Sequence, residues 1–339
     1  MHIRQLTEIF QTAVESCQPQ KLLPELLSVS SGFIHIKNHR FNRTETGAIC
    51  LIAAGKAAGA MAREAEKVFG SLIKEGLCVT KYGHALPLQR IRVIEAAHPE
   101  PDENSLLAGQ VVHQLLNRLT GKEILLFLIS GVASSLITDL PEGASEKELR
   151  EGYRLLVNSG ADIKEINCVR KHLSRIKGGQ LAKAAFPAPV INLLISDVPG
   201  DDLQTIGSGI TVPDPTSFED ALAVLNKYRL TDKFPLSLKI YLEKGSSGQY
   251  PETPKPGDPA FRFTINEIIA SNKLALNTAI SMAEKSGYHI WKTVTPITGE
   301  TNEEALSFAR LLQGYDGPLP AFFIRGGEST LRVSGNGKG

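Results

Sequence analysis

The sequence predicts a two-domain α/β protein built around a parallel sheet. Its 339 residues suit two domains, because a single domain usually holds about 100–200 residues. Short apolar runs such as 124–129 and 190–195, the second interrupted only by Asn192, are typical of buried parallel strands, and amphipathic helical patterns alternate with them. Residues 244–260 hold four prolines and three glycines. That composition indicates a surface connection, which we place at 246–260 between domains 1–245 and 261–339.

The overall composition excludes several classes of protein. Lys plus Arg number 37 and Asp plus Glu number 36, for a net charge of +1, whereas general nucleic-acid binders carry a basic excess. No apolar run approaches the roughly 20 residues of a membrane span. The first 17 residues predict an amphipathic helix without the apolar core or cleavage site of a signal peptide. No cysteine pair has zinc-site spacing, and Cys50 and Cys78 lie in apolar runs that are typical of core residues. We therefore expect free thiols and a reduced, cytoplasmic protein.

The first strand, expected over 47–54, ends at Gly55 and Lys56 before a helix that starts with small residues. This order favours phosphate binding, because a helix N-terminus offers free N–H groups and a positive dipole. A lysine there opposes the dipole, which favours a functional role for Lys56 over that of a solvated helix-end lysine. The segment is not a P-loop, since the glycine spacing and the Ser or Thr after the lysine are missing.

Two more strands are expected over 76–80 and 91–95, followed by a helix that Asp102 caps and that runs to residue 119. His98 lies before this helix, between apolar residues and prolines. Two interpretations stay open for it, a structural loop histidine or a contact to substrate.

The plainest strand, over 124–129, ends in Ser130, Gly131, Ser134 and Ser135. Hydroxyl groups and a glycine at a strand end suit phosphate oxygens. The alternative is a serine-rich turn that satisfies its own backbone.

Capping signals then predict helices that begin after Ser145, Asp162 and, further on, Ser217, with Gly178-Gly179 as a break between two helices. The second helix is rich in basic residues, Arg170 among them. A charged helix face is usually solvated, but this one directly precedes an acidic loop and so is a candidate for contact with polyphosphate.

That acidic loop follows the strand over 190–195. Asp197, Asp201 and Asp202 place three carboxylates within six residues, and Mg²⁺ prefers such oxygen ligands. Its glycines let backbone N–H groups approach an anion closely. In open α/β sheets the ligand crevice lies beyond the carboxyl ends of the strands. The alternative interpretation is an acidic surface loop.

The second part of the chain predicts strands over 261–270, 289–295 and 321–324, with helices over 272–285 and up to 313. The sequence lacks Gly-x-Gly-x-x-Gly after a strand, Gly-x-Ser-x-Gly and His-Glu-x-x-His. It therefore lacks a nicotinamide fingerprint, a hydrolase nucleophile elbow and a zinc-protease motif.

Several stretches together resemble the glycerate 2-kinase family of the DUF4147/MOFRL type, whose members are often named glycerate kinase or hydroxypyruvate reductase. They are AAGKA (53–57), VTKYGH, AHPEPDEN, FLISG, INCVRKHLSRIKGG, ISDVPGDD, GSGITVPDPT, IIASNKLAL and GGEST. The resemblance implies a Rossmann-like N-terminal domain with helices on both faces of its sheet, and a smaller MOFRL-like α/β domain. The family continues beyond the position of Gly339, so we expect that second domain to be partial.

The resemblance also implies a reaction, in which ATP and Mg²⁺ phosphorylate D-glycerate to 2-phosphoglycerate in the cleft between the two domains. Lys56 and Asp197 are then the catalytic residues, with Lys56, His98 and Arg170 on the substrate. The nucleotide and its phosphates would contact Ser130, Gly131, Ser134, Ser208, Gly209, Asn272 and Glu328. The metal ligands would come from Asp197, Asp201, Asp202 and Asp214. A homodimer is a further expectation.

The sequence departs from the family pattern in three places. The loop 131–135 reads Gly-Val-Ala-Ser-Ser where the family usually shows Gly-Gly-Gly-Ser-Ala, and 209–211 reads Gly-Ile-Thr instead of Gly-Pro-Thr. The chain also ends before an arginine-bearing segment. These departures favour one alternative, a relative that binds ligand without turnover. Another alternative is a hydroxypyruvate reductase, which handles the same three-carbon acids, although the missing dinucleotide fingerprint counts against it.

Overall fold

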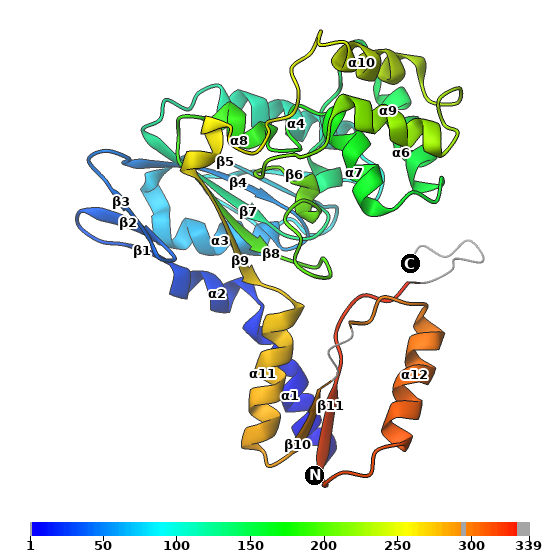
Figure 1. Cartoon of the computed structure of the whole chain (residues 1–339). Helices are drawn as coiled ribbons and strands as arrows, with labels where there is room; N and C mark the ends of the chain where they lie inside the picture. The colour runs from blue at the N-terminus through cyan, green and yellow to red at the C-terminus, as the bar shows by residue number, and fades with distance from the viewer. Residues whose placement is uncertain (1, 293–295, 331–339) are drawn as a thin grey trace. The chain divides into compact units, whose positions relative to one another are not determined.

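A computed structural model of the chain describes residues 2–292 and 296–330, which form two compact units (Figure 1). The larger unit comprises residues 23–198 and 202–269. The smaller takes in the residues up to 22, residues 199–201 and the chain from 270 onwards. The expected connection, 246–260, thus lies inside the larger unit, and the first helix belongs with the C-terminal part.

The larger unit is built on a six-stranded sheet, as the alternation of strands and helices predicts. In chain order its strands are β4 (Ala48–Ala54), β5 (Ile73–Lys81), β6 (Arg92–Ala96), β7 (Glu123–Ile129), β8 (Val190–Ile195) and β9 (Thr264–Ala270). They lie in the order β6-β5-β4-β7-β8-β9, and each pair from β6 to β8 is parallel. This is the doubly wound strand order, and its direction reverses between β4 and β7.

Helices cover both faces of this sheet (Figure 1). One face carries α3 (Ala58–Phe69), with the 3₁₀ turn η1 (Gly70–Leu72) after it, and the other carries α4 (Glu103–Leu116) and α8 (Gln180–Ala185). Alternate residues of β4, namely Cys50, Ile52 and Ala54, share a core with α4 and α8. All seven residues of β4 are buried, which is why the strand reads as a continuous apolar run.

A helical layer with a separate core completes the larger unit. It consists of α6 (Glu146–Val157), α7 (Ile163–His172), α9 (Phe218–Lys227) and α10 (Leu236–Ser246). The expected helix starts are confirmed, because Ser145, Asp162 and Ser217 each form a capping box with the residue three positions on. The predicted break at Gly178-Gly179 is also confirmed, since α7 ends at His172 and α8 begins at Gln180.

The proline-rich segment is fastened to the larger unit. Thr253 is buried, and Pro254 accepts a hydrogen bond at 2.9 Å from the amide of Asp214. The 3₁₀ helix η3 (Pro259–Phe263) then leads into β9, where Asn266 bonds Asn192 of β8 at 3.0 Å. Prolines and glycines mark turns here, and the polar partners that fasten those turns lie elsewhere in the chain.

A small antiparallel sheet precedes β4. It contains β1 (Leu27–Val29), β2 (Phe33–Ile36) and β3 (His39–Asn42), and α2 (Pro19–Leu26) leads into it. Glu267 of β9 connects this sheet to the main sheet, because it pairs with Lys37 and, at 3.2 Å, with His39.

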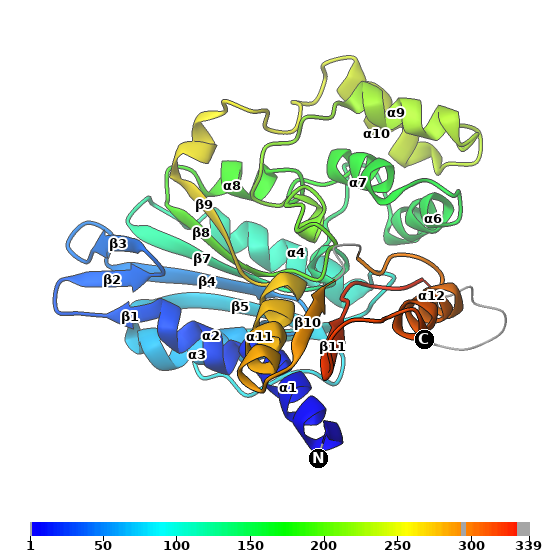
Figure 2. The same ribbon diagram turned by 60° about the horizontal axis from the view of Figure 1, so that its bottom comes forward.

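In the smaller unit, α1 (His2–Ser16) packs along α11 (Asn272–Lys285), and the two helices lie side by side in both views (Figures 1 and 2). β10 (His289–Lys292) and β11 (Ala321–Ile324) form a parallel pair, and α12 (Thr301–Gln313) lies between them in sequence. Its core is small and includes Ile9, Ala279, Ala283, Tyr288 and Phe322. Residues 293–295 of the predicted strand 289–295 lie outside the described residues. Within the described parts of both units, no helix has the length and apolar character needed to cross a membrane.

Candidate active site

The strand ends on either side of the reversal point are joined to each other by hydrogen bonds. Ser130, which follows β7, donates its amide to Ala54 O at 2.9 Å. Lys56 donates its amide to Gly131 O at 3.1 Å, and the Ala57 amide donates to Ser130 Oγ at 2.9 Å. This places Lys56 directly beside Gly131. The amides of Lys56 and Ala57 are therefore bonded within the protein, which leaves fewer backbone N–H groups at this helix start for the phosphate that the sequence predicts.

Two glycines allow the turns that follow β4, β7 and β8 to approach one another so closely. Gly55 has φ +126°, and a Cβ there would lie 2.2 Å from Ser130 Oγ. A Cβ on Gly131 would lie 1.9 Å from Oδ2 of Asp197, the exposed carboxylate that follows β8. Lys56, Gly131 and Asp197 therefore meet at one edge of the sheet, although they are far apart in sequence. The strand-end rule applied to the sequence anticipates this gathering.

His98 follows β6 and is connected to the same strand ends. It is half-buried, and its Nδ1 lies 2.9 Å from Oγ of Ser135, just beyond Gly131. Burial lowers the pKa of His98, the charges of Lys56, Lys81 and Arg170 lower it further, and Asp197 opposes them. The charges of three cations and one carboxylate thus act on this ring. Sequence reasoning missed Lys81, although it ends β5 and obeys the same strand-end rule as Lys56.

Arg170 of α7 is a largely buried cation held against the ring of Tyr153, 4.8 Å from its centroid. Burial lowers the pKa of its guanidinium. Its Nε makes no hydrogen bond within residues 2–292 and 296–330. A guanidinium with unfilled donors is suited to carboxylate or phosphate oxygens, which it binds in a fixed geometry.

The serines and Gly209 have more specific roles than their sequence positions suggest. Ser134 Oγ lies 2.7 Å from Ser208 Oγ, which donates to Asn167 Oδ1 at 2.9 Å. The Ser134 proton therefore goes to Ser208 in this arrangement. Ser130 Oγ accepts from the Ala57 amide, and within the described residues no acceptor is seen for its own proton. Gly209 accepts the amide of Gly179 at 2.8 Å and so fastens the loop to the start of α8.

Among the four predicted metal ligands, all of which the structure describes, Asp197 is the exposed carboxylate. Asp214 is fully buried and accepts from Lys171 at 3.3 Å, Thr216 at 2.8 Å and Thr253 at 3.1 Å. Asp202 accepts from the Gln204 amide and the Thr205 hydroxyl, both at 3.0 Å, within its own turn, which includes η2 (Ile206–Ser208). Asp201 belongs to the smaller unit. Across the described ranges, no three His, Cys, Asp or Glu side chains are grouped to hold a metal.

Asn272 and Glu328 lie in the smaller unit. Asn272 begins α11, and a Cβ on Gly326 would lie 2.2 Å from its Oδ1. Glu328 is exposed, and its amide donates to Ile297 O at 2.9 Å. Their contact with a nucleotide stays a prediction from the sequence.

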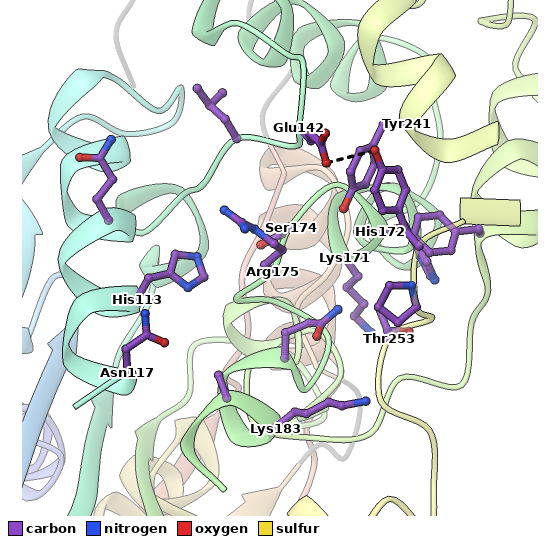
Figure 3. Close-up of a pocket in the computed structure, with 17 residues that line it drawn as sticks. His113, Asn117, Glu142, Lys171, His172, Ser174, Arg175, Lys183, Tyr241 and Thr253 are labelled. Atoms are coloured by element: carbon purple, nitrogen blue, oxygen red, sulfur yellow. Dashed lines mark hydrogen bonds between the residues drawn. The ribbon is translucent and has the colours of Figure 1, made fainter. Parts of the chain in front are cut away.

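The larger unit also contains a cavity of about 940 Å³ between its sheet and helical layers. Figure 3 shows His113 of α4 and Asn117, which follows α4, on one side of it, and Lys171 and His172 of α7 on the other. Its lysines and arginine already have carboxylate partners: Lys171 with Asp214 at 3.3 Å, Arg175 with Asp139 at 3.9 Å and Lys183 with Asp258 at 3.5 Å. The lining includes neither Lys56 nor Asp197, so this cavity is distinct from the strand ends where those two residues lie.

Comparison with known proteins gives matches over nearly the whole chain. Residues 5–243 match a family model described as "Domain of unknown function (DUF4147)". Glycerate 2-kinase of Pyrococcus horikoshii is 37% identical over 343 residues, which cover 99% of this chain and 76% of that protein. An Agrobacterium vitis protein named "Putative hydroxypyruvate reductase" is 35% identical and covers 97% of this chain and 70% of its own length.

The structural comparison agrees with the sequence matches. The crystal structure of glycerate kinase from Thermotoga maritima superposes with a TM-score of 0.83 at 34% identity, covering 100% of this chain and 77% of the other. The family model spans more than half of the chain, and the relatives are matched over most of their own lengths. On this combined basis, the chain belongs to the DUF4147 family of glycerate kinases.

Proposed function

We propose that this protein transfers a phosphoryl group from ATP to the C2 hydroxyl of D-glycerate and forms 2-phosphoglycerate. The observation that carries the proposal is the position of Lys56 and Asp197, on either side of Gly131 at the reversal point of the sheet. The names of the Pyrococcus and Thermotoga relatives support glycerate as the acceptor.

Phosphoryl transfer depends mainly on positioning and charge neutralisation. Lys56, Lys81 and Arg170 supply positive charge around His98 for the glycerate carboxylate and the transferring phosphoryl group. Asp197 either accepts the proton of the attacking hydroxyl or binds Mg²⁺, and both roles suit an exposed carboxylate at this edge of the sheet.

The residues present fit a magnesium ion that is completed by the nucleotide. Mg²⁺ is commonly held by one or two carboxylates together with substrate phosphates. Within the described chain Asp197 has no hydrogen-bond partner, so it fits that role, whereas Asp214 already faces the ammonium of Lys171. When bound, Mg²⁺ would neutralise charge on the phosphates.

The test of this function is an assay of ATP- and Mg²⁺-dependent formation of 2-phosphoglycerate from D-glycerate. We expect Lys56→Ala and Asp197→Asn each to lower kcat about 10²-fold or more, because each removes a partner of the transition state. Lys164→Ala and Asp232→Asn are matched controls, since both residues are exposed. A fully active Asp197→Asn enzyme, or 3-phosphoglycerate as the product, would contradict the proposal.

A magnesium titration of the same variants separates the two roles of Asp197. If the carboxylate binds the metal, Asp197→Asn needs more Mg²⁺ for half-maximal activity. If it accepts the proton, kcat falls while the Mg²⁺ requirement stays the same.

A second candidate is the reduction of hydroxypyruvate, which the name of the Agrobacterium relative favours. It predicts oxidation of NADH or NADPH by hydroxypyruvate. The amides of Lys56, Ala57 and Ala58 are already bonded at the first strand end, which leaves little of the backbone cradle that a dinucleotide pyrophosphate requires. Nicotinamide oxidation without ATP turnover would replace the kinase proposal with this one.

A further inference from the structure

A hydrogen-bonded chain behind His98 favours one of the two neutral tautomers of its ring. Ser135 Oγ lies 3.0 Å from Val132 O, and a carbonyl oxygen can only accept. With its single proton given to Val132, the Ser135 oxygen must accept from the ring nitrogen 2.9 Å away, which is Nδ1 of His98. The neutral ring is then the Nδ1–H tautomer, and its Nε2 carries a lone pair.

Nε2 of His98 is the ring nitrogen that remains available to a ligand. In the part of the chain that the structure describes, no donor bonds it, and it is absent from the nitrogen and oxygen atoms that are buried without a partner. The charged groups around the ring are Lys56 after β4, Lys81 of β5, Arg170 of α7 and Asp197 after β8. A hydroxy acid whose carboxylate meets these cations therefore brings its hydroxyl groups next to two acceptors, Asp197 and His98.

The environment suits His98 to accepting a hydrogen bond and not to taking up a proton. Burial and then the neighbouring cations lower the pKa of His98, against the charge of Asp197. The ring thus stays neutral at pH 7, when Nε2 still accepts. The hydroxyl it binds is accordingly one that keeps its proton.

We propose that Ser135 is a positioning residue that sets the tautomer of His98, so that Nε2 accepts a hydrogen bond from the substrate hydroxyl that is not phosphorylated. This rests on the proposed function, in which the reacting hydroxyl is at C2 and the other at C3. Ser135 and His98 together then make the site bind a dihydroxy acid more tightly than a monohydroxy acid. An acid without the second hydroxyl leaves Nε2 without a donor in a partly desolvated site, which weakens binding.

The tautomer is tested by nitrogen-15 NMR of the histidine rings in the ligand-free protein. We expect the His98 signals to show a protonated Nδ1 and an unprotonated Nε2 at neutral pH. Ser135→Ala should shift the ring toward the other tautomer, and Ser135→Thr, which keeps a hydroxyl, should preserve the wild-type signals. Ser134→Ala is the matched control, because Ser134 bonds Ser208. An unprotonated Nδ1 in the wild type would overturn the proposal.

Selectivity is tested with D-glycerate and D-lactate, which lacks only the C3 hydroxyl. In Ser135→Ala and His98→Phe, we expect the KM for D-glycerate to rise about tenfold, the worth of one hydrogen bond, with little change in kcat. The inhibition constant of D-lactate should change less than twofold. Equal weakening of both acids would reduce His98 to a packing role and refute the inference.

A titration followed by the same NMR signals separates this inference from the proposed function. D-Glycerate should move the His98 Nε2 signal and D-lactate should not, whether or not turnover occurs. Absence of kinase activity with this response intact would reject the kinase while keeping the hydroxyl contact. Turnover without this NMR response would support the kinase and reject the hydroxyl contact of His98.

Discussion

At the scale of single residues, the corner after β7 holds a strained backbone at Val132. Its φ is 72° and its ψ is 3°, in the left-handed region that a β-branched residue rarely adopts. The conformation directs Val132 O into α5 (Ala133–Leu136), where it accepts the Ser135 and Leu136 amides as well as the Ser135 hydroxyl. The strain thus supports the carbonyl on which the His98 tautomer depends.

This strain predicts an unusual order of stability at position 132. Val132→Gly and Val132→Ala both remove the contacts of the valine with the core, but only glycine adopts this φ without cost. We expect the glycine variant to be more stable than the alanine variant by about 1 kcal/mol, measured by urea denaturation. Gln114 is the control, because in the exposed interior of α4 alanine should be the more stable of the pair. Equal stability of the two variants at 132 would show that the backbone is unstrained.

At the scale of elements, Asp214 connects α7 to the segment 246–260. Its carboxylate accepts from Lys171 of α7 and Thr253 of the segment, and its amide donates to Pro254 O. The side chain of Lys171 is only 5% exposed and that of Asp214 is 0% exposed. A buried pair of this kind holds two elements in place, and either charge left alone is costly.

We therefore expect Asp214→Asn to lower the free energy of unfolding by about 3 kcal/mol, since it leaves the Lys171 ammonium buried without its counter-charge. Urea denaturation measures this loss, and the double variant Lys171→Met/Asp214→Asn should lose less than Asp214→Asn alone. The Mg²⁺ concentration for half-maximal activity should stay unchanged. If Asp214→Asn instead raised the Mg²⁺ requirement and left the stability unchanged, Asp214 would be a metal ligand and the structural role would be wrong.

At the scale of the whole molecule, the two units have separate cores of very different size. The core of the larger unit runs through the sheet and its helices, whereas that of the smaller unit rests on a few side chains such as Ile9, Tyr288 and Phe322. Because stability grows with buried apolar surface, the smaller unit should open at lower free energy than the larger one.

The cysteines report on this difference. Cys50, Cys78 and Cys168 are buried in the larger unit, while Cys17 is half-buried in the smaller unit. Burial raises the pKa of Cys50 and of Cys78 to about 12, so neither thiol reacts while folded at pH 8. We expect a thiol reagent to label Cys17 at lower urea than the other three, and Cys17→Ser to remove that early phase. Labelling of all four in one transition would contradict separate opening.

Local sequence signals predicted much of the fold, because they depend on neighbours a few residues away. The capping boxes at Ser145, Asp162 and Ser217 need only the residue three positions on. The bounds of β8 and β11 follow from apolar runs, which Asn192 alone interrupts in β8. The proline-rich segment shows the limit of such signals, since its composition indicates turns and says nothing of the distant Asp214 that fastens it.

The sequence by itself determined that polar strand ends would meet, because parallel strands bring their carboxyl ends to one edge of a sheet. Lys56, Ser130 and Asp197 were predictable for that reason. Only the tertiary structure decided which polar atoms stay available there: the Ser134 proton goes to Ser208, and Ser135 determines the tautomer of His98. A side chain's chemistry depends on the partners that reach it in space, and here those partners come from separate loops and helices.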